Sequence, residues 1–260
     1  MCLILFSYEM HPIYRLVIAA NRDEYYDRST EPASFWTEHP DLLAGKDNKA
    51  GGTWLGLTKK GQWAAVTNFR DPANFKINAL SRGLLVNRFL MKDRSPRQYV
   101  ESLGKVLDSY NGFNLLMGNP SGIYYFSSFT RTLKKLSPGL YGISNHLLDT
   151  PWPKVKRGKK ALSELLKTGT KINPENVFSL LSDRIQPDDS QLPDTGIGIQ
   201  CERLLSTIFI SSNIYGTRSS MVVLIDRENH VDFRERTYNS HQNSMDERYF
   251  EFRIKESNPA

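Results

Sequence analysis

The chain has 260 residues, with 34 Lys and Arg against 28 Asp and Glu, and a formal net charge of +6. Its length and its hydrophobic fraction of 39% exclude a disordered chain and provide enough apolar material for a substantial core. The apolar runs are far too short to cross a bilayer. The modest positive charge favours an anionic ligand or surface over a nucleic acid.

The start of the chain lacks the basic region and small-residue cleavage site of a secretory signal. Its two cysteines, Cys2 and Cys201, are too few for a disulfide framework and have no CxxC neighbour that would bind zinc. We therefore expect a cytoplasmic protein with no metal site and no required cofactor.

Apolar and β-branched runs predict a strand hairpin at 2–8 and 14–20 and a second hairpin at 53–58 and 62–68, with Gly61 in its turn. Two helices follow, one over 81–91 and one that begins at Pro96 and ends at Asn111-Gly112. Further along the chain, strands are predicted at 113–117, 123–129, 132–136 and 140–144. A second helix pair is predicted at 153–167 and 174–181, and the last strands at 206–210, 221–226, 231–237 and 248–254.

Strands arranged as hairpins exclude a doubly wound parallel sheet. Two helix pairs placed between strand groups suit two sheets, each with a helical layer on its outer face. The sequence therefore predicts an α+β fold, a four-layer αββα sandwich, in a single domain over residues 1–260. The longest irregular stretch, 186–202, is either a lid or a plain surface loop.

Cys2 is the first candidate for chemistry. Removal of Met1 would leave a cysteine that carries its own α-amine, and this amine can accept the thiol proton near neutral pH. The alternative is that Cys2 is a small apolar residue that opens a buried strand.

The tetrapeptide Asn21-Arg22-Asp23-Glu24 ends the second strand, across the hairpin from Cys2. Because side chains alternate along a strand, Asn21 and Asp23 should share one face, and Arg22 and Glu24 the other. Only one of these pairs can share a face with Cys2. A solvated turn is the alternative interpretation.

Asparagines also end two other predicted strands. Asn68 and Asn145 each carry an amide that could help to stabilise an oxyanion, although each could instead initiate a turn. The stretch that contains Arg218 has the same two interpretations, and the glycines around Trp54 allow a close approach of the backbone.

Taken together, these segments resemble the NRDE family (transport and Golgi organisation protein 2-like). The resemblance spans nearly the whole chain in order. It rests on Cys2, Asn21-Arg22-Asp23-Glu24, Gly51-Gly52-Thr53-Trp54-Leu55-Gly56, Thr67-Asn68, Asn111-Gly112-Phe113-Asn114-Leu115, Gly142-Ile143-Ser144-Asn145, Thr150-Pro151-Trp152, Gln191-Leu192-Pro193-Asp194 and Tyr215-Gly216-Thr217-Arg218.

The resemblance implies an N-terminal-nucleophile (Ntn) hydrolase-like fold and roles in haem trafficking or acyl-CoA binding. It also implies that Asp23 holds the Cys2 amine, and that Asn68, Asn145 and Arg218 lie where relatives keep oxyanion-binding and orienting groups. Hydrolases of this fold carry Arg-Asn-x-Asp on the second strand, and here Ala20 takes the place of that arginine. Arg22 would need the chain to twist before it could substitute.

Two hypotheses follow. The first is a carrier of an anionic hydrophobic ligand, most of all haem and secondarily acyl-CoA, with His146 as a candidate axial ligand. The basic helix at 154–171 favours anions, although a solvated helix face would look the same. The second is a thiol amidohydrolase with Cys2 as nucleophile and Cys2, Asp23, Asn68, Asn145 and Arg218 as catalytic residues.

The predicted ligand-binding residues are Asn21, Arg22, Glu24, Trp54, Arg70 and His146. We expect a small-molecule ligand and no nucleic-acid partner, and transient contact with a membrane surface stays open.

Overall fold

The computed structural model describes residues 2–92, 94–119, 121–241 and 243–255. The chain divides into two compact units, of which the first comprises residues 1–27 and 138–251 and the second residues 28–137 and 252–260. Each unit contains one antiparallel sheet with its own helices. That the two units make up a single domain stays a prediction.

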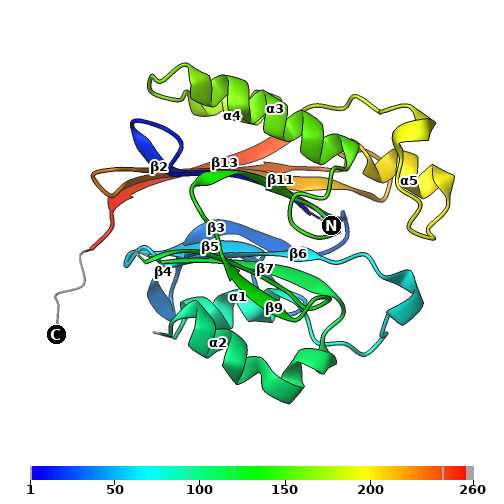
Figure 1. Cartoon of the computed structure of the whole chain (residues 1–260), viewed down its shortest axis with the longest axis horizontal. Coiled ribbons are helices and arrows are strands. Elements are labelled where there is room, and N and C mark those ends of the chain that lie inside the picture. Colours follow the sequence, from blue (N-terminus) through cyan, green and yellow to red (C-terminus); the bar gives the residue numbers. More distant parts are fainter. Residues whose placement is uncertain (1, 93, 120, 242, 256–260) are drawn as a thin grey trace. The chain divides into compact units, whose positions relative to one another are not determined.

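The first sheet has six strands in the order β10-β1-β2-β11-β12-β13 (Figure 1). The first hairpin of the sequence, β1 and β2, lies in the middle of the sheet because β10 and β11, which come more than 100 residues later, pair on either side of it. The strands are β1 (Cys2–Tyr8), β2 (Tyr14–Tyr25), β10 (Gly139–Ile143), β11 (Tyr215–Asp226), β12 (His230–Tyr238) and β13 (Ser244–Arg253).

Helices α3 (Pro153–Lys167) and α4 (Pro174–Leu181) cover one face of this sheet (Figure 1). Gly158 allows α3 to approach β1 closely, since an added Cβ would lie 2.6 Å from Leu5 Cδ1. The core between helices and strands includes Leu3, Leu5, Val17, Ala19, Val155, Leu162, Val177 and Phe178. A short helix, α5 (Ile199–Leu205), precedes β11.

The second sheet has seven strands that follow one another in sequence order. They are β3 (Thr30–Trp36), β4 (His39–Asp47), β5 (Leu55–Thr58), β6 (Trp63–Asn68), β7 (Phe113–Asn119), β8 (Gly122–Ser127) and β9 (Thr132–Lys135). Helices α1 (Gly83–Leu90) and α2 (Pro96–Leu103) share a core with this sheet. Ser95 begins α2 with a reciprocal capping box to Gln98, and a 3-10 turn (Gly104–Ser109) continues the helix. Two further 3-10 turns span Pro72–Asn74 and Asp189–Gln191.

The predicted α+β class, with two antiparallel sheets that each carry helices, is confirmed. Helices α3 and α4 have the predicted bounds, and Gly61 adopts the expected positive φ of 80°. One helix and two strands were not predicted: the strands are β3 and β4, which form a hairpin, and the helix is α5, which begins within the stretch that was expected to be irregular.

The strand predicted at 206–210 is wrong. This apolar segment is buried but does not form a strand, and its last residue, Ile210, bonds to β11 through the Thr217 N–H. Its preceding polar groups bond elsewhere, since the Ile208 carbonyl accepts from the Asn21 side chain and the Phe209 N–H donates to the Asp183 carbonyl. Burial and β-branched composition therefore misled the prediction.

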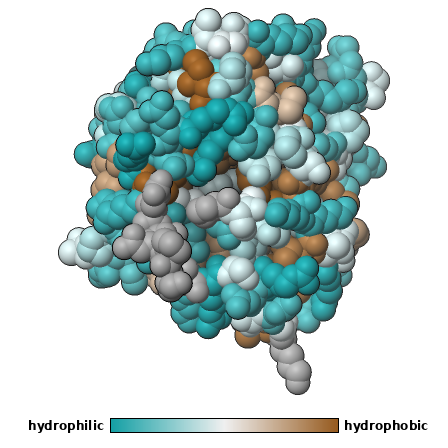
Figure 2. All heavy atoms as spheres, turned by 60° about the vertical axis from the view of Figure 1, so that its left-hand side comes forward, coloured by the Kyte–Doolittle hydropathy of each residue, from teal (hydrophilic) through white to brown (hydrophobic). Residues whose placement is uncertain are grey.

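On the face drawn in Figure 2, hydrophilic side chains predominate and hydrophobic ones appear in small separate patches. Among the described residues, no helix is both long enough and apolar enough to cross a membrane.

Candidate functional site

Cys2 begins β1 and is paired directly with Arg22 of β2. Residues that face each other across an antiparallel pair project their side chains to the same side of the sheet. Cys2, Ile4 and Phe6 therefore share a face with Arg22 and Ala20, while Leu3 and Leu5 point to the helices. Of the two pairs in the Asn-Arg-Asp-Glu motif, Arg22 and Glu24 therefore share the face of Cys2.

This register removes the twist that Arg22 was expected to need. Arg22 is two residues beyond Ala20, so the two already share a face, and Arg22 lies one step closer to the end of the sheet, directly beside Cys2. The Arg22 side chain is 6% exposed, and one of its guanidinium nitrogens lies 4.0 Å from Glu24 Oε2. A guanidinium group is thus buried next to the thiol.

Asn21 points the other way and is held by the fold. Its amide nitrogen donates to the carbonyls of Leu181 (2.8 Å) and Ile208 (2.9 Å), and its oxygen accepts from Ser220 Oγ (2.6 Å). Both amide hydrogens are therefore used within the protein, on the helix side of the sheet. The structure gives Asn21 a structural role, and its predicted ligand contact stays a prediction.

Asp23 is 1% exposed, and its carboxylate accepts a hydrogen bond from Thr217 Oγ1 at 2.8 Å. Thr217 in turn accepts from the Ile210 N–H, so that its hydroxyl is fixed on both sides. Burial raises the pKa of the Asp23 carboxyl, and the charge of buried Lys154 opposes that shift. Burial also raises the pKa of the Cys2 thiol, an effect that the charge of Asp23 reinforces and the charge of Arg22 opposes.

Arg218 lies where β11 is irregular. Thr217 pairs with Asp23 and Ser219 with Arg22, so Arg218 is the extra residue of a bulge, a device that redirects a side chain. Its guanidinium donates to the carbonyls of Tyr25 and Tyr26, at 2.8 and 3.0 Å. Burial, followed by the nearby charge of Arg22, lowers the pKa of Arg218. Two guanidinium groups therefore act on each other at this end of the sheet.

Tyr215 completes the same end of the sheet. Its hydroxyl donates to the Asp23 carbonyl at 3.1 Å. Burial, reinforced by the charge of Asp23, holds the pKa of Tyr215 well above its usual value. Tyr215 thus stays a neutral hydrogen-bond donor throughout the physiological range.

Strand β10 pairs with β1 on the edge opposite β2, and Ser144 and Asn145 directly follow β10. Ser144 Oγ lies 3.1 Å from the Cys2 carbonyl and 3.2 Å from Asn145 Oδ1, and Asn145 is fully buried. His146 follows, with Nδ1 2.9 Å from Thr150 Oγ1 and its ring near Trp152. Burial lowers the pKa of His146 and favours its neutral form.

Three predicted site residues belong to the second unit. Asn68 ends β6, Trp54 precedes β5 and Arg70 follows β6, and all three are half-buried. Their predicted roles stay predictions. Met1, whose removal the hydrolase hypothesis requires, lies outside the described residues.

The basic helix is less uniform than its sequence suggested. Lys154 is 2% exposed, Lys159 pairs with Asp149 and Arg157 with Asp183. The interaction of Lys154 with Asp23 had no signal in the sequence, because an amphipathic pattern does not distinguish a lysine in the first helical turn that reaches into a site from one in water. Among the described residues, no group of His, Cys, Asp and Glu side chains could hold a metal ion.

The sequence profile described as Transport and Golgi organisation 2 matches residues 1–240. The chain belongs to this family. Its relatives include the Transport and Golgi organization protein 2 homologs of Bos taurus (37% identical) and Homo sapiens (35%), each over 257 residues, 91% of this chain and 93% of the relative. Transport and Golgi organization protein 2 of Drosophila melanogaster is 28% identical over 268 residues, 91% of this chain and 92% of the relative. Membership in the Transport and Golgi organisation 2 family confirms the resemblance inferred from the motifs.

Two solved structures also align with the chain, both with a TM-score of 0.43. One is the Caenorhabditis elegans N-acylethanolamine-hydrolyzing acid amidase ortholog, at 10% identity over 86% of this chain and 92% of that one. The other is the C2A mutant of conjugated bile acid hydrolase from Clostridium perfringens, at 9% identity over 100% and 99%. At this level of likeness they carry no argument about the chemistry of this chain.

Proposed function

We propose that the end of the first sheet around Cys2 binds an anionic, largely apolar small molecule, with haem as the leading ligand and acyl-CoA as the second. The observation that supports this proposal is the pair of guanidinium groups at that end of the sheet. Arg22 is 6% exposed, and its charge lowers the pKa of Arg218. Two cations that destabilise each other are both stabilised when a carboxylate or phosphate binds between or beside them.

The surroundings of Arg22 suit a ligand with an apolar body. On its face of the sheet, Ile18, Ala20 and Met221 occupy the neighbouring positions of β2 and β11. Apolar neighbours lower the local dielectric constant and strengthen the attraction between a guanidinium and an anion. Haem propionates and CoA phosphates are both anions of the kind that arginine binds with paired hydrogen bonds.

Cys2 and His146 are the candidates for an axial ligand of haem iron. The His146 Nδ1 is engaged with Thr150, so that coordination would use Nε2. The lowered pKa of His146 favours the neutral imidazole, which is the form that binds metals.

A haem titration followed by absorbance tests the proposal. Arg22→Gln removes the buried guanidinium and should weaken binding by roughly 10- to 100-fold, because a hydrogen bond to a charged group contributes about 1.5–3 kcal/mol. Arg248→Gln is the matched control, since Arg248 is exposed on β13 and pairs with Asp246. His146→Ala and Cys2→Ala then test each axial ligand by the shift of the absorbance maximum.

The absence of a saturable change in the wild type would contradict haem as the ligand, and calorimetry with an acyl-CoA then tests the second ligand. Equal affinities of the Arg22→Gln variant and the wild type would contradict the site itself. Mass spectrometry of whatever ligand copurifies with the protein provides an independent identification.

A second candidate function is that of an N-terminal cysteine amidohydrolase. It is favoured by the position of Asp23, whose buried carboxylate acts electrostatically on the Cys2 thiol and is fixed by Thr217. In this mechanism the sulfur attacks the amide carbon, the C–N bond breaks, and the thiol proton passes through the α-amine to the leaving amine. Water then hydrolyses the thioester.

Intact mass measurement tests the hydrolase directly, because the mechanism requires a free α-amine on Cys2. A retained Met1 would exclude it. If Met1 is absent, Cys2→Ala should abolish any turnover of amide substrates while leaving anion binding largely intact.

A further inference from the structure

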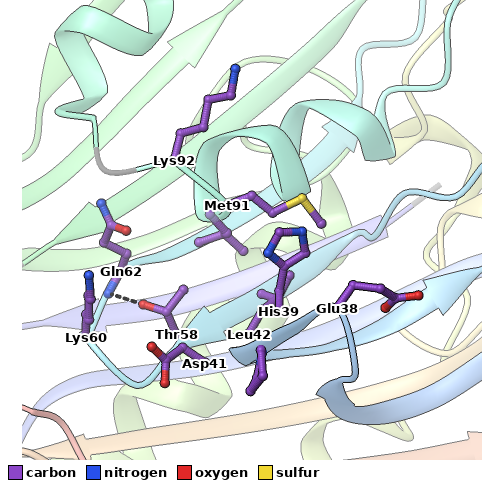
Figure 3. Close-up of a pocket in the computed structure, with 11 residues that line it drawn as sticks. Glu38, His39, Asp41, Leu42, Thr58, Lys60, Gln62, Met91 and Lys92 are labelled. Atoms are coloured by element: carbon purple, nitrogen blue, oxygen red, sulfur yellow. Dashed lines mark hydrogen bonds between the residues drawn. The ribbon is translucent and has the colours of Figure 1, made fainter.

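A recess with a volume of about 280 Å³ lies among residues of the second unit only (Figure 3). The start of β4, the β5–β6 turn and the end of α1 form its walls. Its floor is apolar, since Leu42 and Leu90 are buried there and Met91 is half-buried. Figure 3 shows the Met91 thioether beside the His39 ring at one end and Lys60 and Gln62 at the other.

The charges that line the recess are not balanced. Two acids line it, but each already pairs with a lysine from outside the recess. Asp41 Oδ1 lies 3.7 Å from Lys255 Nζ, and Glu38 Oε1 lies 3.9 Å from Lys46 Nζ. Both pairs are exposed or half-exposed and neutralise the acids at least in part.

Among the described residues, neither lysine of the recess has such a partner. Lys60 and Lys92 are exposed at its rim, and no ion pair involves either of them within the part of the chain that the structure describes. The uncompensated charge of the recess is therefore positive, and it is carried by two primary ammonium groups with three donors each.

Neutral hydrogen-bond donors in the recess also favour an anionic ligand. Thr58 is 4% exposed, and its Oγ1 accepts the Gln62 backbone N–H at 3.2 Å, which is the dashed line in Figure 3. Because the oxygen acts as acceptor within the turn, the hydroxyl hydrogen is what Thr58 can offer to a ligand. The Gln62 side-chain amide, which also lines the recess, has two further donor hydrogens.

From these observations we infer that the recess binds a small amphipathic anion, with its carboxylate or phosphate head at the Lys60 end, beside Thr58, and a short apolar chain on the Leu42, Leu90 and Met91 floor, while Lys92 on the opposite rim adds to the positive potential. The volume lies just below the lower end of the range for drug-sized ligands, roughly 300 Å³, which restricts the occupant to a short-chain molecule. This inference does not depend on the proposed function, because it involves none of the residues around Cys2.

Methyl NMR of the full chain with labelled methionines tests the inference, because Met91 reports on the floor and Met117 and Met221 report elsewhere. The probes are octanoate and hexyl phosphate, with 1-octanol as the neutral counterpart. We expect a saturable shift of the Met91 signal with at least one of the two anions, and binding of 1-octanol at least about tenfold weaker. Comparison of the two anions distinguishes a carboxylate head from a phosphate head.

Two double variants with the same change in net charge distinguish anion binding at the recess from a general effect of the protein's positive charge. The double variant Lys60→Gln/Lys92→Gln should weaken anion binding about tenfold or more, whereas Lys156→Gln/Lys160→Gln, on the exposed face of α3, should leave it unchanged. All four lysines are exposed, so both variants should fold, and circular dichroism checks this. The inference is overturned if neither anion shifts Met91, if 1-octanol binds equally well, or if the two double variants behave alike.

Discussion

Replacement of Asn21 by leucine should destabilise the protein by about 3–4 kcal/mol. Leucine nearly preserves the side-chain volume but removes three hydrogen bonds, to the Leu181 carbonyl, the Ile208 carbonyl and the Ser220 hydroxyl, at a site that is 1% exposed. Each buried partner left unsatisfied costs roughly 1–3 kcal/mol, and the burial of the apolar leucine side chain offsets part of the sum. The variant would leave two carbonyls and one hydroxyl without their partner.

Urea unfolding at constant m-value measures this loss, and Ser220→Ala is the matched comparison. Removal of the Ser220 hydroxyl breaks one of the three bonds and should cost about 1 kcal/mol. A loss below about 1 kcal/mol for Asn21→Leu would refute the structural role. So would a variant of unchanged stability that no longer binds the ligand, since that result would place Asn21 in the binding site instead.

Three further predictions concern other parts of the chain. Gly118→Ala should lower the unfolding free energy by about 1–3 kcal/mol, because an added Cβ would lie 1.8 Å from Trp63 Nε1, and an unchanged denaturation midpoint would contradict this packing. Burial lowers the pKa of His11, whose Nδ1 accepts two backbone N–H groups, so the folded state favours the neutral ring and stability should fall as the pH drops below about 6.5. His11→Asn should flatten that part of the stability profile, and parallel profiles would show that another group is responsible. Alkylation at neutral pH should label exposed Cys201 before half-buried Cys2, whose pKa burial raises, and peptide mapping that finds equal labelling would indicate an activated Cys2 thiolate.

Local patterns predicted most of the secondary structure correctly. Helices α3 and α4 begin at prolines in their first turn and carry regular apolar stripes, so that their bounds followed from the sequence. The β3–β4 hairpin was missed because Pro32, Pro40 and scattered charged residues interrupt its alternation. Proline is tolerated in β3 because this strand lies at the edge of the sheet.

The candidate site was only partly predictable. Alternation along β2 correctly separated Asn21 from Arg22, but the pair that faces Cys2 depends on the register between β1 and β2, and a shift of one residue would reverse it. The electrostatic effect of Lys154 on Asp23 depends on how α3 is placed over the sheet, and no local sequence pattern predicts that placement. The bulge at Arg218 likewise arises from the pairing of β11 with β2, two segments almost 200 residues apart.

The order of strands in the two sheets has a consequence for biosynthesis. All seven strands of the second unit leave the ribosome in the order in which they pair, so its sheet can form by successive local additions. Strands β1 and β2 are translated first, yet β2 gains its partner β11 only after about 190 further residues have been made. During that interval a central strand of the first sheet has an unpaired edge, and an unpaired strand edge is the kind of surface through which incomplete chains aggregate.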